Sequence, residues 1–282
     1  MSQTSTTRMP NGTVELSIDD GVATITLDRP DSLNSMNNHL MDDIRAAIET
    51  SEADTGVGVV VLTGNGRGFC AGADLNAMGS EPSGDPPPGA DRDIDAGTAA
   101  VDGMNNHFNP TLRAIKNCAV PTVARINGVA AGGGLGLALS CDIGIAAESA
   151  FFVATFGPRL GIVPDLGSTW TLPHKIGVTR AMAMAMLGER VPAQQAQEWG
   201  LIYSAVPDDE LDTEVARVTN ILKRTSGEAM QRIRTSIESA STRSFSDQLD
   251  VERDHQAVLI PMNMLEGAKA FMEKREPDFR QL

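Results

Sequence analysis

The fold of this chain depends most on residues 127–142, which read NGVAAGGGLGLALSCD. The apolar run before them, residues 121–126, predicts a buried strand, and the leucines after the glycines predict a buried helix. Three consecutive glycines leave the backbone bare between the two, so a substrate atom can approach it closely. The first N–H groups of such a helix are unpaired and carry partial positive charge. The stretch therefore predicts a site for an anion or a developing oxyanion, or else tight helix–strand packing without a ligand.

The composition is that of a globular protein of 282 residues, 41% hydrophobic and only 4% aromatic. This length fits one large domain, or a core with an accessory piece. No run of about eighteen apolar residues occurs, so we expect no membrane association. Residues 1–10 are rich in Ser and Thr and contain no apolar segment. We interpret them as a disordered lead-in rather than a signal peptide.

The charged, histidine and cysteine residues exclude several function classes. With 37 acidic against 23 basic residues the net charge is −14, which argues against a nucleic-acid partner. The four histidines are scattered, so we expect no metal site. Cys70, Cys118 and Cys141 are widely spaced and odd in number. This pattern is typical of reduced thiols, and we expect a cytoplasmic protein.

The first part of the chain alternates predicted strands and helices. Residues 14–27 alternate apolar and polar side chains around Asp19-Asp20-Gly21, which is typical of a hairpin. Segment 28–34 predicts a loop, and helical spacing follows over 37–50. The continuous β-branched run at 57–63 predicts a strand buried on both faces.

A second glycine-rich element, residues 64–75, reads GNGRGFCAGADL and follows that strand directly. Gly66, Gly68 and Ala71 match a dinucleotide-binding pattern. That fold also needs a helix, a second strand and an acid about twenty residues further on. Residues 79–89 read GSEPSGDPPPG instead, which disfavours nucleotide redox chemistry. A loop of this length predicts a mobile lid or the wall of a substrate pocket.

The second part of the chain is predicted to be mixed at first and then helical. Helical spacing over residues 104–117 leads to the strand at 121–126. Short strands are predicted at 143–146, 151–154 and 202–206, and short helices at 167–176, 181–187 and 193–199. From Leu211 onward the chain is predicted to be helical with a break at Pro261. We expect this tail to pack on another subunit.

Two glycine-rich elements, residues 70–74 and 131–134, thus each follow a buried strand. Two backbone N–H groups from such elements would form an oxyanion hole if they converged on one point. An enolate or a tetrahedral oxyanion derived from a thioester is a natural occupant of such a hole.

Over residues 14–279 the chain resembles the enoyl-CoA hydratase/isomerase, or crotonase, superfamily. The most specific motifs are LDRP at 27–30 with Leu33-Asn34, GFCAGADL at 68–75, and residues 127–134 with Cys141-Asp142. The resemblance implies an α/β fold, a crotonase-like spiral of ββα units with a C-terminal helical segment. It implies that residues 11–206 form the core with the acyl-CoA site, and that residues 207–282 assemble a homotrimer or homohexamer.

The resemblance also implies how acyl-CoA is bound. The backbone N–H groups of Ala73 and Gly133 would hold the thioester oxygen, and no cofactor beyond the acyl-CoA substrate is implied. The residues that would contact CoA are Arg29, Leu33, Ala71, Asp74 and Leu75, with Phe271 and Lys274 supplied by a neighbouring subunit.

Several of these residues have plainer alternatives. Arg29 and Lys274 could be ordinary surface charges, and Asp74 could serve only to fix its loop. His107 borders the long loop and could line the acyl pocket or simply face solvent.

The chain departs from the hydratase pattern at both catalytic acids that the family implies. The first glutamate would stand in the helix after the glycines, where this chain has Gly136. The second would fall at 156–158, and no Asp or Glu occurs anywhere from 151 to 164. The next carboxylate is Asp165.

An acid directly after Val-Pro resembles the catalytic aspartate of the ring-epoxide isomerases of phenylacetate breakdown, and dienoyl-CoA isomerases also carry one there. Residues 67–70, 197–202 and 250–254 strengthen the first likeness. One carboxylate suffices to move a proton. We expect Asp165 to take a proton from the carbon γ to the thioester and return it to the α carbon. The alternative is that Asp165 caps the helix that contains Trp170.

The leading prediction is therefore an acyl-CoA isomerase of the enoyl-CoA hydratase/isomerase family with Asp165 as base. One alternative is an enoyl-CoA hydratase with untypical acids. Another is a catalytically silent acyl-CoA-binding protein. An acyl hydrolase is disfavoured because no nucleophile elbow is present.

Overall fold

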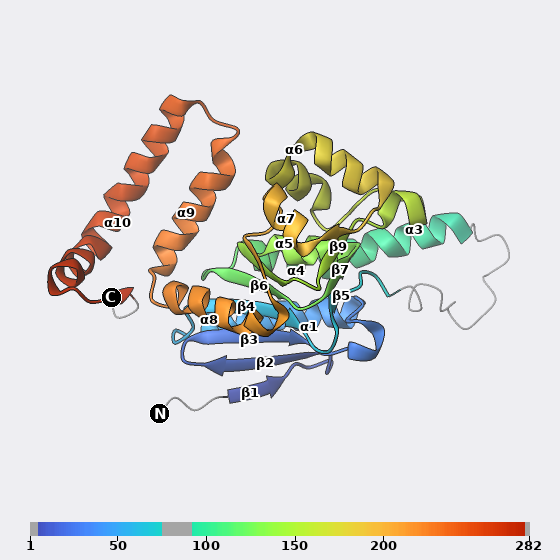
Figure 1. Cartoon of the computed structure of the whole chain (residues 1–282), viewed down its shortest axis with the longest axis horizontal. Helices are drawn as coiled ribbons and strands as arrows, with labels where there is room; N and C mark the ends of the chain where they lie inside the picture. Colours follow the sequence, from blue (N-terminus) through green and yellow to red (C-terminus); the bar gives the residue numbers. More distant parts are fainter. Residues whose placement is uncertain (1–4, 75–91, 280–282) are drawn as a thin grey trace.

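The structure is a computed structural model that describes residues 5–74 and 92–279, without the side chains of residues 92–96. Figure 1 shows two sheets with helices packed around them and a pair of helices, α9 and α10, standing apart at one end. The larger sheet has the order β1 (Ser5–Arg8), β2 (Val14–Asp19), β3 (Val22–Leu27), β4 (Val59–Gly64), β6 (Thr122–Ile126), β8 (Ile143–Ala147) and β11 (Ser204–Val206). The smaller sheet has the order β10 (Val191–Pro192), β9 (Phe151–Val153), β7 (Val129–Ala131) and β5 (Gly68–Cys70).

The predicted hairpin is confirmed, because β2 and β3 pair antiparallel from Val14 opposite Leu27 to Asp19 opposite Val22. Asp20 and Gly21 connect them with φ angles of 43° and 78°, the left-handed pair that a tight two-residue turn needs. From β3 through β11 all neighbours in the larger sheet are parallel. Parallel neighbours require crossovers, and helices supply several of them.

The helices of the first two thirds of the chain cover the sheets. They are α1 (Asn38–Ala53), α3 (Arg92–Gly103), α4 (Asn109–Lys116), α5 (Gly133–Ser140), α6 (Ser168–Leu187) and α7 (Ala193–Trp199), with the π-helices η2 (Met104–Phe108) and η3 (Phe156–Leu160) and the 3₁₀ turn η1 (Pro30–Ser32). Asn37 begins α1 by accepting a hydrogen bond from the Leu40 N–H, which satisfies one unpaired donor. The break predicted between Ile176 and Ala181 is present as a kink at Gly177.

The main hydrophobic core lies between α1, the two sheets and α5. Its largest fully buried side chains include Phe69, Phe152, Leu40, Ile44 and Leu135. A second apolar cluster lies on the other face of the larger sheet, under α8 (Leu211–Leu222). Strand β4 contributes Val60 and Leu62 to the first cluster and Val59 and Val61 to the second, as expected of a strand buried on both faces.

The C-terminal tail is helical, as predicted, and consists of the 3₁₀ turn η4 (Asp208–Glu210), α8, α9 (Gly227–Ala240) and α10 (Phe245–Glu273). The predicted break at Pro261 is wrong, because α10 runs through it. Proline removes only one N–H from the helix, the one that would bond to the Ala257 carbonyl. Ala257 and Pro261 are both exposed, so water can donate a hydrogen bond to the Ala257 carbonyl and the helix continues.

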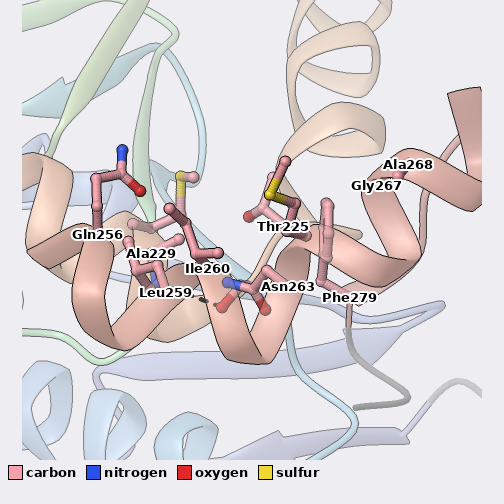
Figure 2. A pocket seen from close by; sticks show the side chains of 12 residues that line it. Thr225, Ala229, Gln256, Leu259, Ile260, Asn263, Gly267, Ala268 and Phe279 are labelled. Carbon is pink, nitrogen blue, oxygen red and sulfur yellow. Dashed lines mark hydrogen bonds between the residues drawn. The ribbon is translucent and has the colours of Figure 1, made fainter.

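A pocket lies where α9 and α10 meet, and Figure 2 shows it from close by. Its lining includes Ala229, Leu259, Ile260 and Phe279. None of the residues predicted to bind substrate lines it. No helix within residues 5–74 and 92–279 is long and apolar enough to span a membrane.

Candidate active site

The first glycine-rich turn is held in place by an isolated parallel bridge between Met36 and Ala73. The Met36 N–H donates to the Gly72 carbonyl at 2.7 Å, and the Asp74 N–H donates to the Met36 carbonyl at 2.9 Å. In such a bridge the N–H of the middle residue, Ala73, points away from the partner strand. No described residue accepts a hydrogen bond from it.

The second glycine-rich turn begins α5. Gly132 has a φ of 51° and its N–H donates to the Val153 carbonyl at 2.9 Å. The positive φ of Gly132 would be strained for a residue with a side chain. Gly133 is the first residue of the helix, so its N–H has no partner within the helix.

The structure brings these two turns together. A Cβ placed on Gly72 would lie 2.8 Å from the Ala131 carbonyl oxygen and 3.4 Å from the Gly133 nitrogen. Gly72, the residue next to Ala73, therefore lies close to the start of α5, with no room for a side chain between the two turns. A Cβ on Gly133 itself would collide with Met36 Cε and lie 2.6 Å from Leu166 Cδ1, so Met36 and Leu166 cover this position.

Asp165 lies at the start of a tight turn that packs on α5. The Ser168 N–H donates to the Asp165 carbonyl at 2.9 Å, and Leu166 and Gly167 have φ angles of 49° and 74°. These values describe a type I′ turn. Leu166, the residue after Asp165, is the residue that covers Gly133 and Gly136.

The carboxyl of Asp165 has an unusual environment. Its Oδ1 is buried and has no hydrogen-bond partner in the structure, and burial raises the pKa of this carboxyl above its ordinary value of 3.8. The capping alternative is not seen: Gly167 is the N-cap of α6, and no side chain caps that helix. Perturbed carboxyls of this kind concentrate at functional sites.

Sequence reasoning missed Ser168. It is fully buried, and its Oγ, like Asp165 Oδ1, has no hydrogen-bond partner. Among the described residues, Asp165 and Ser168 supply the only two buried side-chain polar atoms without one. The available signal was the sequence Asp-Leu-Gly-Ser, in which the glycine permits a turn that places the two polar residues at its two ends.

Position 136, where the family implies the first hydratase glutamate, is closely covered by the same turn. A Cβ on Gly136 would lie 2.6 Å from the Leu166 carbonyl oxygen, 2.8 Å from Leu166 Cβ and 3.1 Å from Ser168 Oγ. Real Cβ atoms do not tolerate the first two distances. A glutamate at this position is therefore incompatible with the turn that carries Asp165.

The predicted CoA-binding residues of the first half of the chain lie close together. The Ala71 N–H donates to the Leu33 carbonyl at 3.0 Å, and Arg29 Nη2 lies 2.7 Å from Asp74 Oδ2. Arg29 also donates to the Ser35 carbonyl. The guanidinium of Arg29 is thus bonded to groups within the loop. The ion pair with Asp74 ties the loop down, which is the structural role given above as the alternative for Asp74. Leu75 and the whole of the predicted lid or pocket wall, residues 79–89, lie outside the described residues.

The remaining predicted residues lie elsewhere. Phe271 and Lys274 lie at the C-terminal end of α10, which Figure 1 places at the opposite end of the molecule from α3. Within one chain the structure does not bring them to the other predicted site residues. His107 lies on η2, and its Nδ1 is 2.9 Å from Oδ2 of Asp42 on α1. Within the described ranges, no three His, Cys, Asp or Glu side chains gather around a possible metal position.

Comparison with known proteins agrees with this architecture. Residues 17–282 match the family described as enoyl-CoA hydratase/isomerase. The 1,2-epoxyphenylacetyl-CoA isomerase of Escherichia coli K12 is 39% identical over 93% of this chain and 96% of its own length. A probable enoyl-CoA hydratase of Rhodobacter capsulatus is 36% identical over 95% of this chain and 97% of its own.

A solved structure described as a putative enoyl-CoA hydratase/isomerase from Mycobacterium abscessus superimposes with a TM-score of 0.84 at 30% identity, covering 94% of this chain and 98% of that one. The two-sheet α/β fold is thus the crotonase fold, as predicted. The chain belongs to the enoyl-CoA hydratase/isomerase family of enzymes, which act on acyl-CoA thioesters. The resemblance to its phenylacetate-pathway isomerase subgroup is confirmed as well.

Proposed function

We propose that this protein is an acyl-CoA isomerase that moves a double bond, or rearranges a ring epoxide, with Asp165 as its base. The observation that carries the proposal is the buried, unpaired Oδ1 of Asp165 on a turn packed against α5, the helix that begins at Gly133. The E. coli relative named above is itself an isomerase, which supports the proposal, while the R. capsulatus relative is a probable hydratase.

The reaction needs two elements from the chain. The N–H groups of Ala73 and Gly133 hold the thioester oxygen and stabilise negative charge as it develops there. The Asp165 carboxylate takes a proton from the γ carbon, the carbon–carbon π electrons shift toward the thioester, and a dienolate forms. The protonated Asp165 then returns the proton to the α carbon, so the double bond moves and no atom is lost. A 3-enoyl thioester follows the same steps in reverse.

A hydratase needs acids that position and activate water. The close approach of Leu166 to Gly136 leaves no room for the first acid, and residues 151–164 contain none for the second. A hydratase with untypical acids and a catalytically silent binding protein are the two competing functions. Asp165 argues against the silent protein because its raised pKa suits proton transfer.

The deciding experiment compares wild type with Asp165→Asn on a 3-enoyl-CoA and on the matched 2-enoyl-CoA, following absorbance of the conjugated thioester. We expect isomerisation to exceed hydration in wild type and to fall by at least about a hundredfold in Asp165→Asn, the usual contribution of a positioned base. Asp250→Asn, a carboxyl paired with Arg253 on exposed α10, is the matched control. Hydration that survives Asp165→Asn would overturn the mechanism.

The active form is a homotrimer or homohexamer in this proposal. Large apolar side chains lie exposed on α6, α9 and α10, namely Met182, Met186, Ile237, Phe245, Leu265 and Phe271. Apolar faces of this extent typically mark subunit contacts. A neighbouring chain would then bring its Phe271 and Lys274 to this chain's CoA. Sedimentation velocity at micromolar concentration tests the assembly, and a monomer that turns over acyl-CoA would contradict it.

A further inference from the structure

Asp165 and Ser168 occupy the two ends of one type I′ turn. The Ser168 N–H donates to the Asp165 carbonyl at 2.9 Å, which holds the two Cα atoms within about 7 Å of each other. Each of the two side chains contains a buried polar atom without a hydrogen-bond partner, Oδ1 in Asp165 and Oγ in Ser168.

Two buried polar atoms without partners, an acceptor and a donor at the two ends of one turn, are a costly arrangement in a protein interior, where nearly all such atoms are bonded. A serine hydroxyl rotates freely about its Cα–Cβ bond between staggered positions. It is therefore the kind of donor that can turn to a carboxylate once that carboxylate is ionised. A bond at Oδ1 would leave Oδ2 to carry the proton.

We propose that Ser168 is a positioning residue for the reaction, whose hydroxyl donates a hydrogen bond to Oδ1 of the ionised Asp165 and leaves Oδ2 for proton transfer. This inference rests on the proposed function, in which Asp165 is the base. Ser168 itself does not touch the substrate. It stabilises the ionised carboxylate and fixes which oxygen faces the acyl chain.

The surroundings of Asp165 make this contact measurable. Helix α5, which packs against the turn, contains no titratable side chain. The chargeable groups on the other adjoining elements are Arg159 on η3, with His174, Lys175 and Arg180 on α6. Burial is the main cause that raises the pKa of Asp165, and a hydrogen bond from its own backbone lowers it in part. A change at Ser168 should therefore register directly in the titration of Asp165.

The sign of the effect follows from the raised pKa. Asp165 stabilises the folded chain fully below its unfolded pKa of about 3.8, and that contribution is lost as pH rises through the folded pKa. The difference in melting temperature between wild type and Asp165→Asn thus declines with pH and levels off above the folded pKa. This readout needs no substrate.

The test repeats that difference curve in a Ser168→Ala background. Loss of the Ser168 hydroxyl as a donor to the ionised Asp165 should raise the pKa of that carboxyl by about one unit. The pH at which the difference curve levels off, and the acid limb of the kcat–pH profile, should both move upward by the same amount. Ser168→Thr keeps the hydroxyl and should leave both near their wild-type positions. Ser140→Ala removes another buried serine hydroxyl, bonded to the Leu137 carbonyl, and controls for a general loss of packing.

The two proposals fail separately. A folded Ser168→Ala protein whose levelling-off point does not move overturns the role of Ser168, whatever the activity. Isomerisation that persists in Asp165→Asn overturns the proposed base, whatever the titration shows. An effect of Ser168→Thr as large as that of Ser168→Ala would assign the change to shape and also overturn the inference.

Discussion

Arg29 Nη2 lies 2.7 Å from Asp74 Oδ2, so the loop after β3 is tied to the residue that follows Ala73. Both side chains are largely buried. Arg29 also donates to the Ser35 carbonyl, next to Met36, which forms the isolated bridge to Ala73. The pair therefore fixes the backbone that presents one of the two proposed oxyanion donors.

Asp74→Asn should lower kcat about tenfold to a hundredfold, because a donor displaced by about 1 Å loses most of its effect in the transition state. The melting temperature should change much less than the rate. Steady-state kinetics and thermal unfolding measure both quantities on the same sample. Asp250→Asn breaks an exposed pair, with both side chains about two thirds accessible, and should change neither. An unchanged kcat in Asp74→Asn would show that the pair does not position Ala73.

The close packing of Leu166 around Gly136 predicts that no side chain fits at position 136. Gly136→Ala should destabilise the protein by about 1–3 kcal/mol, because the new Cβ would overlap the Leu166 backbone. Gly97→Ala is the matched control, since Gly97 also lies within a helix but its Cβ would meet nothing within 4 Å. That change should stabilise the protein by about 0.5–1 kcal/mol. Thermal unfolding at one protein concentration should show shifts of opposite sign, and equal shifts would contradict the packing around position 136.

The cysteines give a chemical prediction. Cys70, Cys118 and Cys141 are free and buried. Burial raises the pKa of Cys70 and Cys141 to about 12 and that of Cys118 to about 11. Since the thiolate is the reactive form, an aromatic disulfide reagent at pH 8 should label none of them within minutes in the folded protein. The same reagent should titrate all 3 cysteines after unfolding in guanidinium chloride. Fast labelling of the folded chain would show that a thiol is accessible.

Local chemistry explains which parts of the fold could be predicted. The hairpin at Asp20-Gly21 and the kink at Gly177 depend on residues adjacent in sequence, and both were predictable. Contacts between distant segments were not, since no local pattern encodes the ion pair between Arg29 and Asp74, 45 residues apart. Pro261 shows the opposite error, because a local rule predicted a break that an exposed helix tolerates.

The candidate site divides in the same way. The glycines that must bring Ala73 and Gly133 together could be recognised from their motifs, as could the acid at Asp165. The role of Ser168 depends on a turn whose first central residue, Leu166, takes a left-handed φ that leucine rarely adopts. No sequence pattern predicts that conformation, so the placement of Asp165 and Ser168 at the two ends of one turn became visible only in three dimensions.

The attachment of α9 to the core supplies a last prediction. Arg234 on α9 binds Asp142 through two bonds of 2.6 Å and donates to the Cys118 carbonyl at 2.7 Å. Lysine keeps the charge but cannot reproduce this planar, two-pronged contact. Arg234→Lys should therefore cost about 1–3 kcal/mol, visible as a lower melting temperature and faster proteolysis between α8 and α9.

Arg232→Lys is the matched control on the same helix. Among the described residues Arg232 pairs with Glu228 alone, one turn away, and this pair is more exposed than that of Arg234 and Asp142; pairs within one helix contribute little. The control should therefore leave melting and proteolysis nearly unchanged. Equal losses of stability in both variants would show that any arginine-to-lysine change on α9 has this effect. A loss in Arg234→Lys alone would show that the bonds between Arg234 and Asp142 hold α9 against the strands that lead into the proposed oxyanion hole.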